Sequence, residues 1–253
     1  MLGAHLVHMK QVLLAFALLF LCSPWTCQAK DVVFVFEVYP PYEYREGTAL
    51  VGTDVDFIQE VWRRLSLRPV FRELPWSRAL AEVKSGKVDA IFSLVKTPER
   101  EQFLFFPEEY LSFEQFIFLA RRDNPITIST PSDFKGKRVG VCTGYSYDPV
   151  FDADASFDRE EALNDEQQLR KLAGGRMELA IMNRQVFHYT ARRLGMTGLF
   201  QVMPYELEGK HYMYVAFSRA RGLSGQTLAD QFSLTLKALQ REGVLQEILK
   251  KYN

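Results

Sequence analysis

The chain has few cysteines and no excess of charge of either sign. Of its 253 residues three are Cys, and Lys plus Arg equals Asp plus Glu at 31 each. This balance argues against nucleic acid or an anionic membrane as partner, because both attract cationic surfaces. Cys22 and Cys27 fall in an N-terminal segment that we expect to be removed. Cys142 would then stand alone and could form no internal disulfide.

Common enzyme and cofactor motifs are also lacking. The sequence has no G-x-S-x-G elbow, no P-loop and no G-x-G-x-x-G, and no Cys/His cluster has metal-ligand spacing. We therefore predict no metal, no cofactor and no enzymatic activity. Cys142 lies in an apolar stretch and is expected in the core. His211 is expected to be structural or exposed.

Long apolar runs are absent except near the N-terminus. Residues 12–21 form a run of ten, shorter than the roughly 20 that span a bilayer. Lys10 precedes the run, and Cys27-Gln28-Ala29 resembles a cleavage site. We predict that residues 1–29 are a secretory signal peptide and that the mature protein is periplasmic. The alternative is a membrane anchor.

The remaining chain alternates short apolar runs with helical patterns. This order predicts parallel sheets flanked by helices, in an α/β fold. We expect strands at 32–36, 69–73, 88–95, 138–142, 178–182 and 212–217, and helices at 54–65, 77–85, 165–173, 184–194, 226–240 and 244–252.

The periodicity is interrupted at 120–125, which contains two arginines and a proline. We expect the chain to cross there into a second lobe and to return near 212–218. The predicted domains are residues 1–29 as signal peptide, 30–120 with 217–253 as lobe 1, and 121–216 as lobe 2.

The stretch Thr97-Pro98-Glu99-Arg100 is typical of a helix start, with Thr97 as N-cap and Pro98 in the first turn. Arg100 does not fit, because a cation in the first turn opposes the helix dipole. One explanation is an anion held by Arg100 and the free N–H groups of that turn. The alternative is a solvated Arg100 paired with Glu101.

Aromatic side chains follow the first two expected strands. Tyr39-Pro40-Pro41-Tyr42 follows the first strand, where two prolines would keep the loop extended, and Trp76 follows the second. Open α/β sheets bind ligands at this edge. Tyr39, Tyr42 and Trp76 could therefore enclose a flat or apolar ligand group; the alternative is core packing.

Polar residues follow two expected strands of the second unit. Thr143-Gly144-Tyr145-Ser146 could present N–H groups to an anion. Asn183 offers a donor and an acceptor, or it caps the next helix. We count Ser146 and Asn183, together with Ser93 of the third expected strand, among the ligand-binding candidates.

Taken together, these segments resemble family 3 extracellular solute-binding proteins, the polar-amino-acid receptors of bacterial ABC importers. The stretches that carry the resemblance are Tyr39-Pro40-Pro41-Tyr42, Gly52-Thr53-Asp54-Val55-Asp56, Pro75-Trp76, Gly86-Lys87-Val88-Asp89-Ala90-Ile91, Thr97-Pro98-Glu99-Arg100, Lys137-Arg138-Val139-Gly140-Val141 and Gly175-Arg176-Met177-Glu178-Leu179-Ala180.

The resemblance implies a two-lobed periplasmic-binding-protein fold of type II, each lobe a sheet flanked by helices, joined by two hinge strands. It implies that Tyr39 and Trp76 are aromatic walls, and that Arg100 and Ser146 hold a ligand carboxylate. Asn183 departs from the family, because it stands where other members place an acid for the ligand ammonium. We therefore expect a carboxylate without an α-amino group, or an amino acid held less tightly, unless Glu37, Glu43 or another acid reaches into the cleft.

The expected function is capture of a small polar, carboxylate-bearing ligand by a monomer that delivers it to an inner-membrane ABC permease. One alternative is a sensor module that presents the ligand to a membrane receptor. Another is an enzyme similar to the cyclohexadienyl dehydratases on this scaffold, for which Glu37 and Glu43 are the nearest general-acid candidates.

Overall fold

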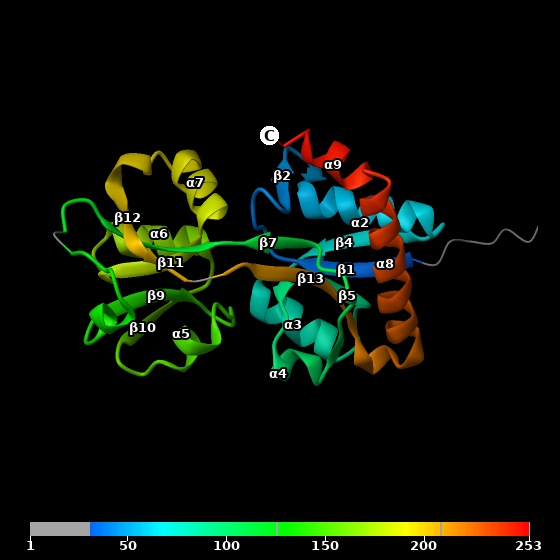
Figure 1. Ribbon diagram of the computed structural model, residues 1–253, viewed down its shortest axis with the longest axis horizontal. Helices are drawn as coiled ribbons and strands as arrows, with labels where there is room; N and C mark the ends of the chain where they lie inside the picture. The colour runs from blue at the N-terminus through cyan, green and yellow to red at the C-terminus, as the bar shows by residue number, and fades with distance from the viewer. Residues whose placement is uncertain (1–30, 125, 208, 253) are drawn as a thin grey trace, which may run out of the picture. The chain divides into compact units, whose positions relative to one another are not determined.

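The computed structural model describes residues 31–252 except positions 125 and 208 (Figure 1). The predicted signal peptide, residues 1–29, lies outside the described residues. Of the helices in the described part, none combines the length and the apolar character that crossing a membrane would require.

One sheet contains strands from both ends of the described chain, in the order β4-β1-β5-β13-β6, with β7 also paired to β13. β1 pairs in parallel with β4 and β5, whereas β13 runs antiparallel to β5. Its strands are β1 (Asp31–Phe36), β4 (Arg68–Glu73), β5 (Ala90–Val95), β6 (Leu104–Phe105), β7 (Ser112–Glu114) and β13 (His211–Ser218). We call this sheet with its helices the first lobe.

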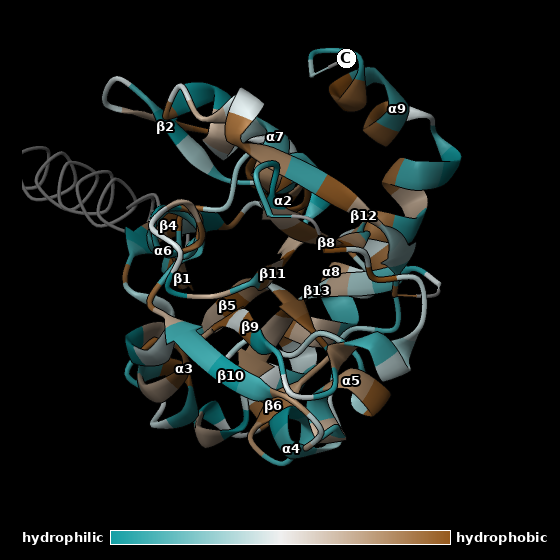
Figure 2. Cartoon of the chain, turned by 90° about the vertical axis from the view of Figure 1, so that its left-hand side faces the viewer, coloured by the Kyte–Doolittle hydropathy of each residue, from teal (hydrophilic) through white to brown (hydrophobic). Residues whose placement is uncertain are grey.

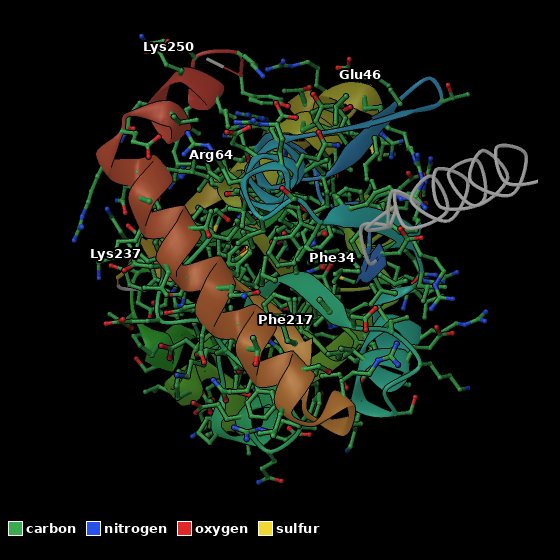
Figure 3. All side chains as sticks on the ribbon, turned by 90° about the vertical axis from the view of Figure 1, so that its right-hand side faces the viewer. Phe34, Glu46, Arg64, Phe217, Lys237 and Lys250 are labelled. Atoms are coloured by element: carbon green, nitrogen blue, oxygen red, sulfur yellow. The ribbon has the colours of Figure 1, made fainter. Side chains whose placement is uncertain are left out.

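Both faces of this sheet are apolar because β1 alternates its side chains. Phe34 and Phe36 enter the core under α2 and α8, and Val35 enters the core under α3. Figure 3 shows α8 passing over Phe217, whose ring lies 6.1 Å from that of Phe232 on the helix. The helices are α2 (Thr53–Arg64), α3 (Trp76–Lys84), α4 (Pro98–Glu101), α8 (Leu223–Arg241) and α9 (Val244–Leu249), and a hairpin is formed by β2 (Tyr44–Glu46) and β3 (Ala49–Val51).

The second sheet has the order β10-β9-β11-β8-β12 and, with its helices, forms the second lobe. In β11 (Leu179–Asn183), Ala180 and Met182 face the core under α6 and α7, while Leu179 and Ile181 face the opposite core. The other elements are β8 (Phe116–Arg121), β9 (Arg138–Cys142), β10 (Asp158–Ala162), β12 (Phe200–Glu206), α5 (Pro149–Ala153), α6 (Asp165–Ala173) and α7 (Arg184–Arg193).

The edge strand β10 is unusually polar. Its sequence is Asp-Arg-Glu-Glu-Ala, and it appears hydrophilic along its length in Figure 2, in contrast to β5 and β13. Charged side chains on an edge strand discourage pairing with another chain. The same composition explains why the sequence pattern did not predict this strand.

The two-lobed α/β prediction is confirmed by both sheets and their flanking helices. The strands change sheet earlier than the crossings that we expected at 120–125 and 212–218. β7 ends at Glu114 in the first sheet and β8 begins at Phe116 in the second; the return lies between Glu206 and His211. We placed the first crossing too far along the chain because β8 is as apolar as the strands of the first lobe, so the sequence shows no break before residue 120. The full domain limits stay a prediction.

Candidate functional site

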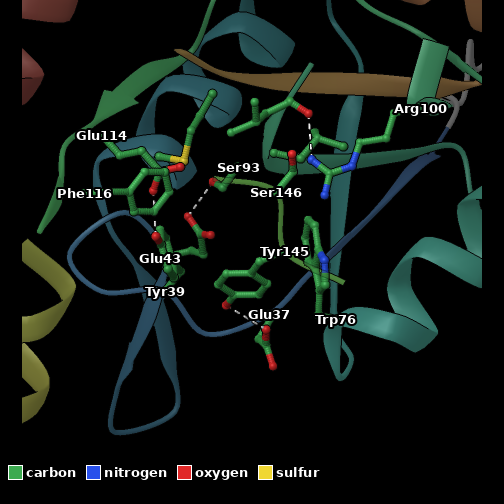
Figure 4. A pocket seen from close by; sticks show the side chains of 13 residues that line it. Glu37, Tyr39, Glu43, Trp76, Ser93, Arg100, Glu114, Phe116, Tyr145 and Ser146 are labelled. Atoms are coloured by element: carbon green, nitrogen blue, oxygen red, sulfur yellow. Dashed lines mark hydrogen bonds between the residues drawn. The ribbon is translucent and has the colours of Figure 1, made fainter. Parts of the chain in front are cut away.

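A cavity of about 30 Å³ lies where the ends of β1 and β5 meet the segment that follows β9 (Figure 4). Five of the predicted site residues line it: Tyr39, Trp76, Ser93, Arg100 and Ser146. The other lining residues are Glu37, Glu43, Leu94, Val95, Glu114, Phe116, Tyr145 and Met213. Tyr42 and Asn183, also predicted, do not line the cavity but lie behind it.

Arg100 lies in the one-turn helix α4, as the sequence predicted. Thr97 is the N-cap, and its hydroxyl accepts the Arg100 backbone N–H. Arg100 is 6% exposed, and its guanidinium donates to the carbonyls of Val95, at 2.7 Å, and Gly144, at 3.1 Å. It forms no ion pair with any carboxylate of the described residues, so the alternative of a solvated Arg100 paired with Glu101 does not occur. Glu101 pairs instead with Lys96.

Burial of this cation has an energetic consequence. Desolvation lowers the pKa of Arg100 to about 10, because its charge is removed from water; the charges of Glu99, Asp152 and Glu114 oppose the shift without pairing with the guanidinium. Two carbonyl bonds use two of its five N–H donors. An anionic ligand group is the partner that would offset the desolvation of the guanidinium.

Tyr39 and Trp76 lie on either side of the cavity, consistent with their expected position. Trp76 begins α3 and donates its indole N–H to the carbonyl of Gly144 in the second lobe, at 2.9 Å.

The Tyr39 loop is not extended, contrary to our expectation. A bridge between Tyr39 and Glu43 closes it into a tight turn, because the Tyr39 carbonyl accepts the N–H of Tyr42. Tyr42 stacks on Tyr39, with ring centroids 5.7 Å apart, and supports that wall.

Ser93 sits at an irregular point of β5. Its neighbours Phe92 and Leu94 pair with Val215 and Tyr214, so Ser93 is the extra residue of a β-bulge, and its φ is +57°. A left-handed conformation costs a non-glycine residue roughly 1–2 kcal/mol. Strain of this kind concentrates at functional sites, and here the bulge lets the Ser93 hydroxyl reach the cavity.

Two buried carboxyl groups meet at the Ser93 hydroxyl. Ser93 Oγ lies 2.8 Å from Glu43 Oε2 and 2.9 Å from Asp54 Oδ2, and Ser112 also donates to Asp54. One hydroxyl has one hydrogen, so it can donate to only one of the two acids. Burial raises the pKa of Asp54 to about 7 and raises the pKa of Glu43 well above its usual range, helped by Asp54. The raised pKa values favour the protonated form of both carboxyls.

Glu114 is a site residue that sequence reasoning missed. It ends β7, is buried, and accepts bonds from the Tyr39 hydroxyl at 2.6 Å and the Asn183 amide at 3.0 Å. Burial raises its pKa to about 7, while these donors and the nearby Arg100 lower it. No local pattern marks an isolated Glu at the end of a three-residue strand.

Asn183 caps α7, which was the alternative interpretation of this residue. Its side-chain oxygen accepts the N–H groups of Gln185 and Val186, and its amide nitrogen donates to Glu114 and Tyr42. Its amide thus holds an acid at the cavity wall rather than facing a ligand. Our ligand expectation held only if no other acid reached the cleft, and Glu37, Glu43 and Glu114 all line the cavity.

The segment after β9 contributes Tyr145 and Ser146. Ser146 lines the cavity, but its hydroxyl donates to Asp152 at 2.9 Å. Tyr145, whose own role the sequence did not indicate, donates to Glu37 at 3.1 Å. Burial raises the pKa of Glu37 to about 7, although this bond opposes the shift.

The two remaining singled-out residues lie outside the cavity. Cys142 is buried with its thiol 3.0 Å from the side-chain oxygen of Gln168, which confirms a core position. His211 lies at the start of β13 against Phe116, with ring centroids 5.1 Å apart.

With this geometry described, comparison with known proteins decides the family. The profile of bacterial extracellular solute-binding proteins, family 3, matches residues 32–253. The chain belongs to this family. This match confirms the resemblance to family 3 solute-binding proteins that the motifs indicated.

Curated relatives of this family 3 protein match over most of their length. A probable amino-acid-binding protein of Bacillus subtilis is 25% identical over 218 residues, covering 84% of this chain and 79% of the relative. An arginine-binding periplasmic protein of Mannheimia haemolytica is 26% identical over 248 residues, covering 96% and 98%.

Solved structures share its fold. A histidine kinase sensor domain with similarity to periplasmic binding proteins aligns with a TM-score of 0.78 and 21% identity, covering 88% of this chain and 96% of that one. An ancestral arginine-binding protein bound to arginine aligns with a TM-score of 0.75 and 20% identity, covering 87% and 97%. At these identities the alignments support the two-lobed fold of the family 3 protein and nothing finer.

Proposed function

We propose that this protein binds a small zwitterion, a molecule with one carboxylate and one ammonium group such as an amino acid, between its lobes. The observation that carries the proposal is the charge distribution of one cavity. Arg100, which pairs with no carboxylate in the described part of the chain, is buried at one side, and Glu43 and Glu114 lie at the other (Figure 4). A zwitterion supplies both missing partners at once.

Each group of the proposed ligand has a chemical counterpart. The carboxylate would accept from the N–H groups of Arg100 that the two carbonyls leave free, with Ser146 beside it. The ammonium would donate to Glu43, Glu114 and the Ser93 hydroxyl. Of our two expectations, this assignment favours an amino acid over a ligand without an α-amino group.

The transport role is part of the same proposal. We infer export with cleavage after Ala29, and delivery of the ligand to an ABC permease by a monomer. The support is membership of an extracellular solute-binding family and the amino-acid-binding names of relatives. We also propose that the lobes close about the two strand crossings at Gln115 and at 207–210.

Calorimetry of the mature chain with a panel of amino acids and their amine-free analogues tests the proposal. Arg100→Ala should weaken binding by about 2–5 kcal/mol, because it leaves the ligand carboxylate unpaired in a buried site. Lys96→Ala is the matched control: Lys96 is a neighbouring cation that pairs with Glu101 at the surface, and its removal should leave affinity unchanged.

Equal affinities of wild type and folded Arg100→Ala for every binder would overturn the assignment of the carboxylate. Binders that all lack a carboxylate would overturn it as well.

A second candidate function is that of a dehydratase-like enzyme, which the two acids in the cavity wall favour. Glu37 and Glu43 line the cavity, and burial raises the pKa of both carboxyls, as a general acid requires. Incubation with a cyclohexadienyl acid, followed by ultraviolet absorbance, separates the two functions. We expect no aromatic product; turnover that Glu37→Gln or Glu43→Gln abolishes would favour the enzyme.

A further inference from the structure

Tyr145 of the second lobe occupies the space between the two aromatic walls of the first. Its ring centroid lies 5.8 Å from that of Trp76 and 6.2 Å from that of Tyr39, edge-on to both. Figure 4 shows the ring between these residues, pointing toward Glu37. The walls thus enclose a side chain of the protein itself.

Several bonds hold Tyr145 there. Its hydroxyl lies 3.1 Å from Glu37 of the first lobe and 3.5 Å from Asp165, the first residue of α6. The preceding carbonyl, of Gly144, accepts from both Trp76 and Arg100. Trp76, Arg100 and Glu37 of the first lobe therefore bind the Gly144–Tyr145 segment. Trp76 and Arg100 are also the residues expected to bind a ligand.

The space left beside Tyr145 is small. A volume of about 30 Å³ holds roughly two waters on the same measure, since one water needs about 10–15 Å³. A second, open cavity of about 730 Å³ also has Glu37, Trp76 and Asp165 in its wall. Glu37 and Trp76 line both cavities, and the Tyr145 hydroxyl bonds to the shared Glu37.

We propose that Tyr145 determines ligand size by filling the compartment between Tyr39 and Trp76, so that only a small zwitterion fits the closed cleft. The inference rests on the proposed function and specifies its ligand class. Removing the ring would enlarge the small cavity toward Glu37, which also lines the larger one. It would also leave Glu37 and Asp165 without their shared hydroxyl partner, so the enlarged compartment would favour a long side chain that ends in a cation.

Calorimetry of three proteins with three ligands tests this. The proteins are wild type, Tyr145→Phe and Tyr145→Ala; the ligands are alanine, arginine and citrulline, which replaces the guanidinium of arginine by a neutral group. Wild type should bind alanine at least about tenfold more tightly than arginine. Tyr145→Ala should reverse this order and prefer arginine to citrulline by at least about tenfold.

Tyr145→Phe is the matched control, because it keeps the ring and removes only the hydroxyl. It should retain the wild-type preference for alanine. Thermal unfolding of all three proteins shows whether each is folded.

The outcomes separate this inference from the proposed function. Tight arginine binding by wild type that Tyr145→Ala weakens, but that still depends on Arg100, overturns the size role and leaves the zwitterion site intact. If neither wild type nor Tyr145→Ala binds any amino acid, with or without Arg100→Ala, both the size role of Tyr145 and the zwitterion site are overturned.

Discussion

The two sides of the cavity carry opposite charge yet do not neutralise each other. On one side the Arg100 guanidinium donates to two carbonyls, and on the other Glu43 and Glu114 accept from hydroxyls and an amide. A salt bridge across the cavity would have been the simplest way to stabilise the empty site. No such salt bridge joins the described residues, which supports the proposal that a zwitterion provides both missing partners.

The sharpest way to break this comparison is to neutralise the acidic side alone. Glu114→Gln should weaken alanine binding by about 1.5–3 kcal/mol, because an ammonium loses a charged acceptor. Propionate, which lacks the amine, should bind wild type and the variant equally. Paired calorimetric titrations measure both values, and an equal loss for the two ligands would show that Glu114 acts through the shape of the site.

The acidic side should also respond to pH in a definite direction. The pKa values of Glu114 and Asp54 are raised to about 7, so the folded state holds protons that the unfolded state releases near pH 4. Their contribution to stability is complete below about pH 4 and is lost as the pH rises to about 7. Alanine affinity should rise over the same interval, because an ammonium prefers the ionised acids.

Thermal unfolding of wild type and Glu114→Gln across that pH range measures how much of the pH dependence of stability comes from Glu114. The wild type should lose stability more steeply with rising pH than the variant. Parallel curves would mean that Glu114 does not titrate in this window.

A smaller effect should follow from a substitution at Gly144, whose carbonyl accepts from both Trp76 and Arg100. Gly144 has φ of +77°, and an added Cβ would lie 3.3 Å from Cδ1 of Trp76. Gly144→Ala should lower the free energy of unfolding by about 1 kcal/mol and also weaken ligand binding. Gly136→Ala is the control, because Gly136 has φ of +70° but no atom within 4 Å of the added Cβ. Both variants share the backbone strain, so binding loss in both would remove any special role for the Trp76 contact.

The smallest expected effect concerns Asn183→Asp. Aspartate is as good an N-cap as asparagine, so α7 should persist. The change replaces the amide donor to Glu114 by a second acid, which should raise the pKa of Glu114 further and leave amino-acid affinity unchanged or slightly lower. Improved affinity for alanine by calorimetry would restore our first view, that position 183 faces the ligand ammonium.

The sequence predicted best where a single pattern governs a segment. The strand at 138–142 and the helix at 165–173 occur at their predicted bounds, because each buries a regular apolar face. β10 was missed because its charges protect an edge, and the short β7 has too few residues for a pattern. The Thr97-Pro98 cap located Arg100 because capping is a local interaction.

The acidic side of the site could not be predicted in the same way. Glu114 is 75 residues from Tyr39 in sequence, and its proximity depends on β7 pairing with β13. Tyr145 reaches the aromatic walls only because the two lobes come together, and no periodicity encodes that contact. Asn183 was misjudged for a related reason: the resemblance gave its position, but only the fold shows that its side chain is occupied by a helix cap and by Glu114.

The bond from the Trp76 indole to the carbonyl of Gly144 makes the site optically observable. Cleavage after Ala29 would remove Trp25 and leave two tryptophans, of which Trp62 is fully buried in the first-lobe core. Opening of the lobes would break the indole bond and hydrate Trp76 while leaving Trp62 in the same surroundings. Intrinsic fluorescence of the unlabelled protein should therefore report lobe opening through Trp76, with emission shifting to longer wavelength as the lobes separate and back as ligand closes them.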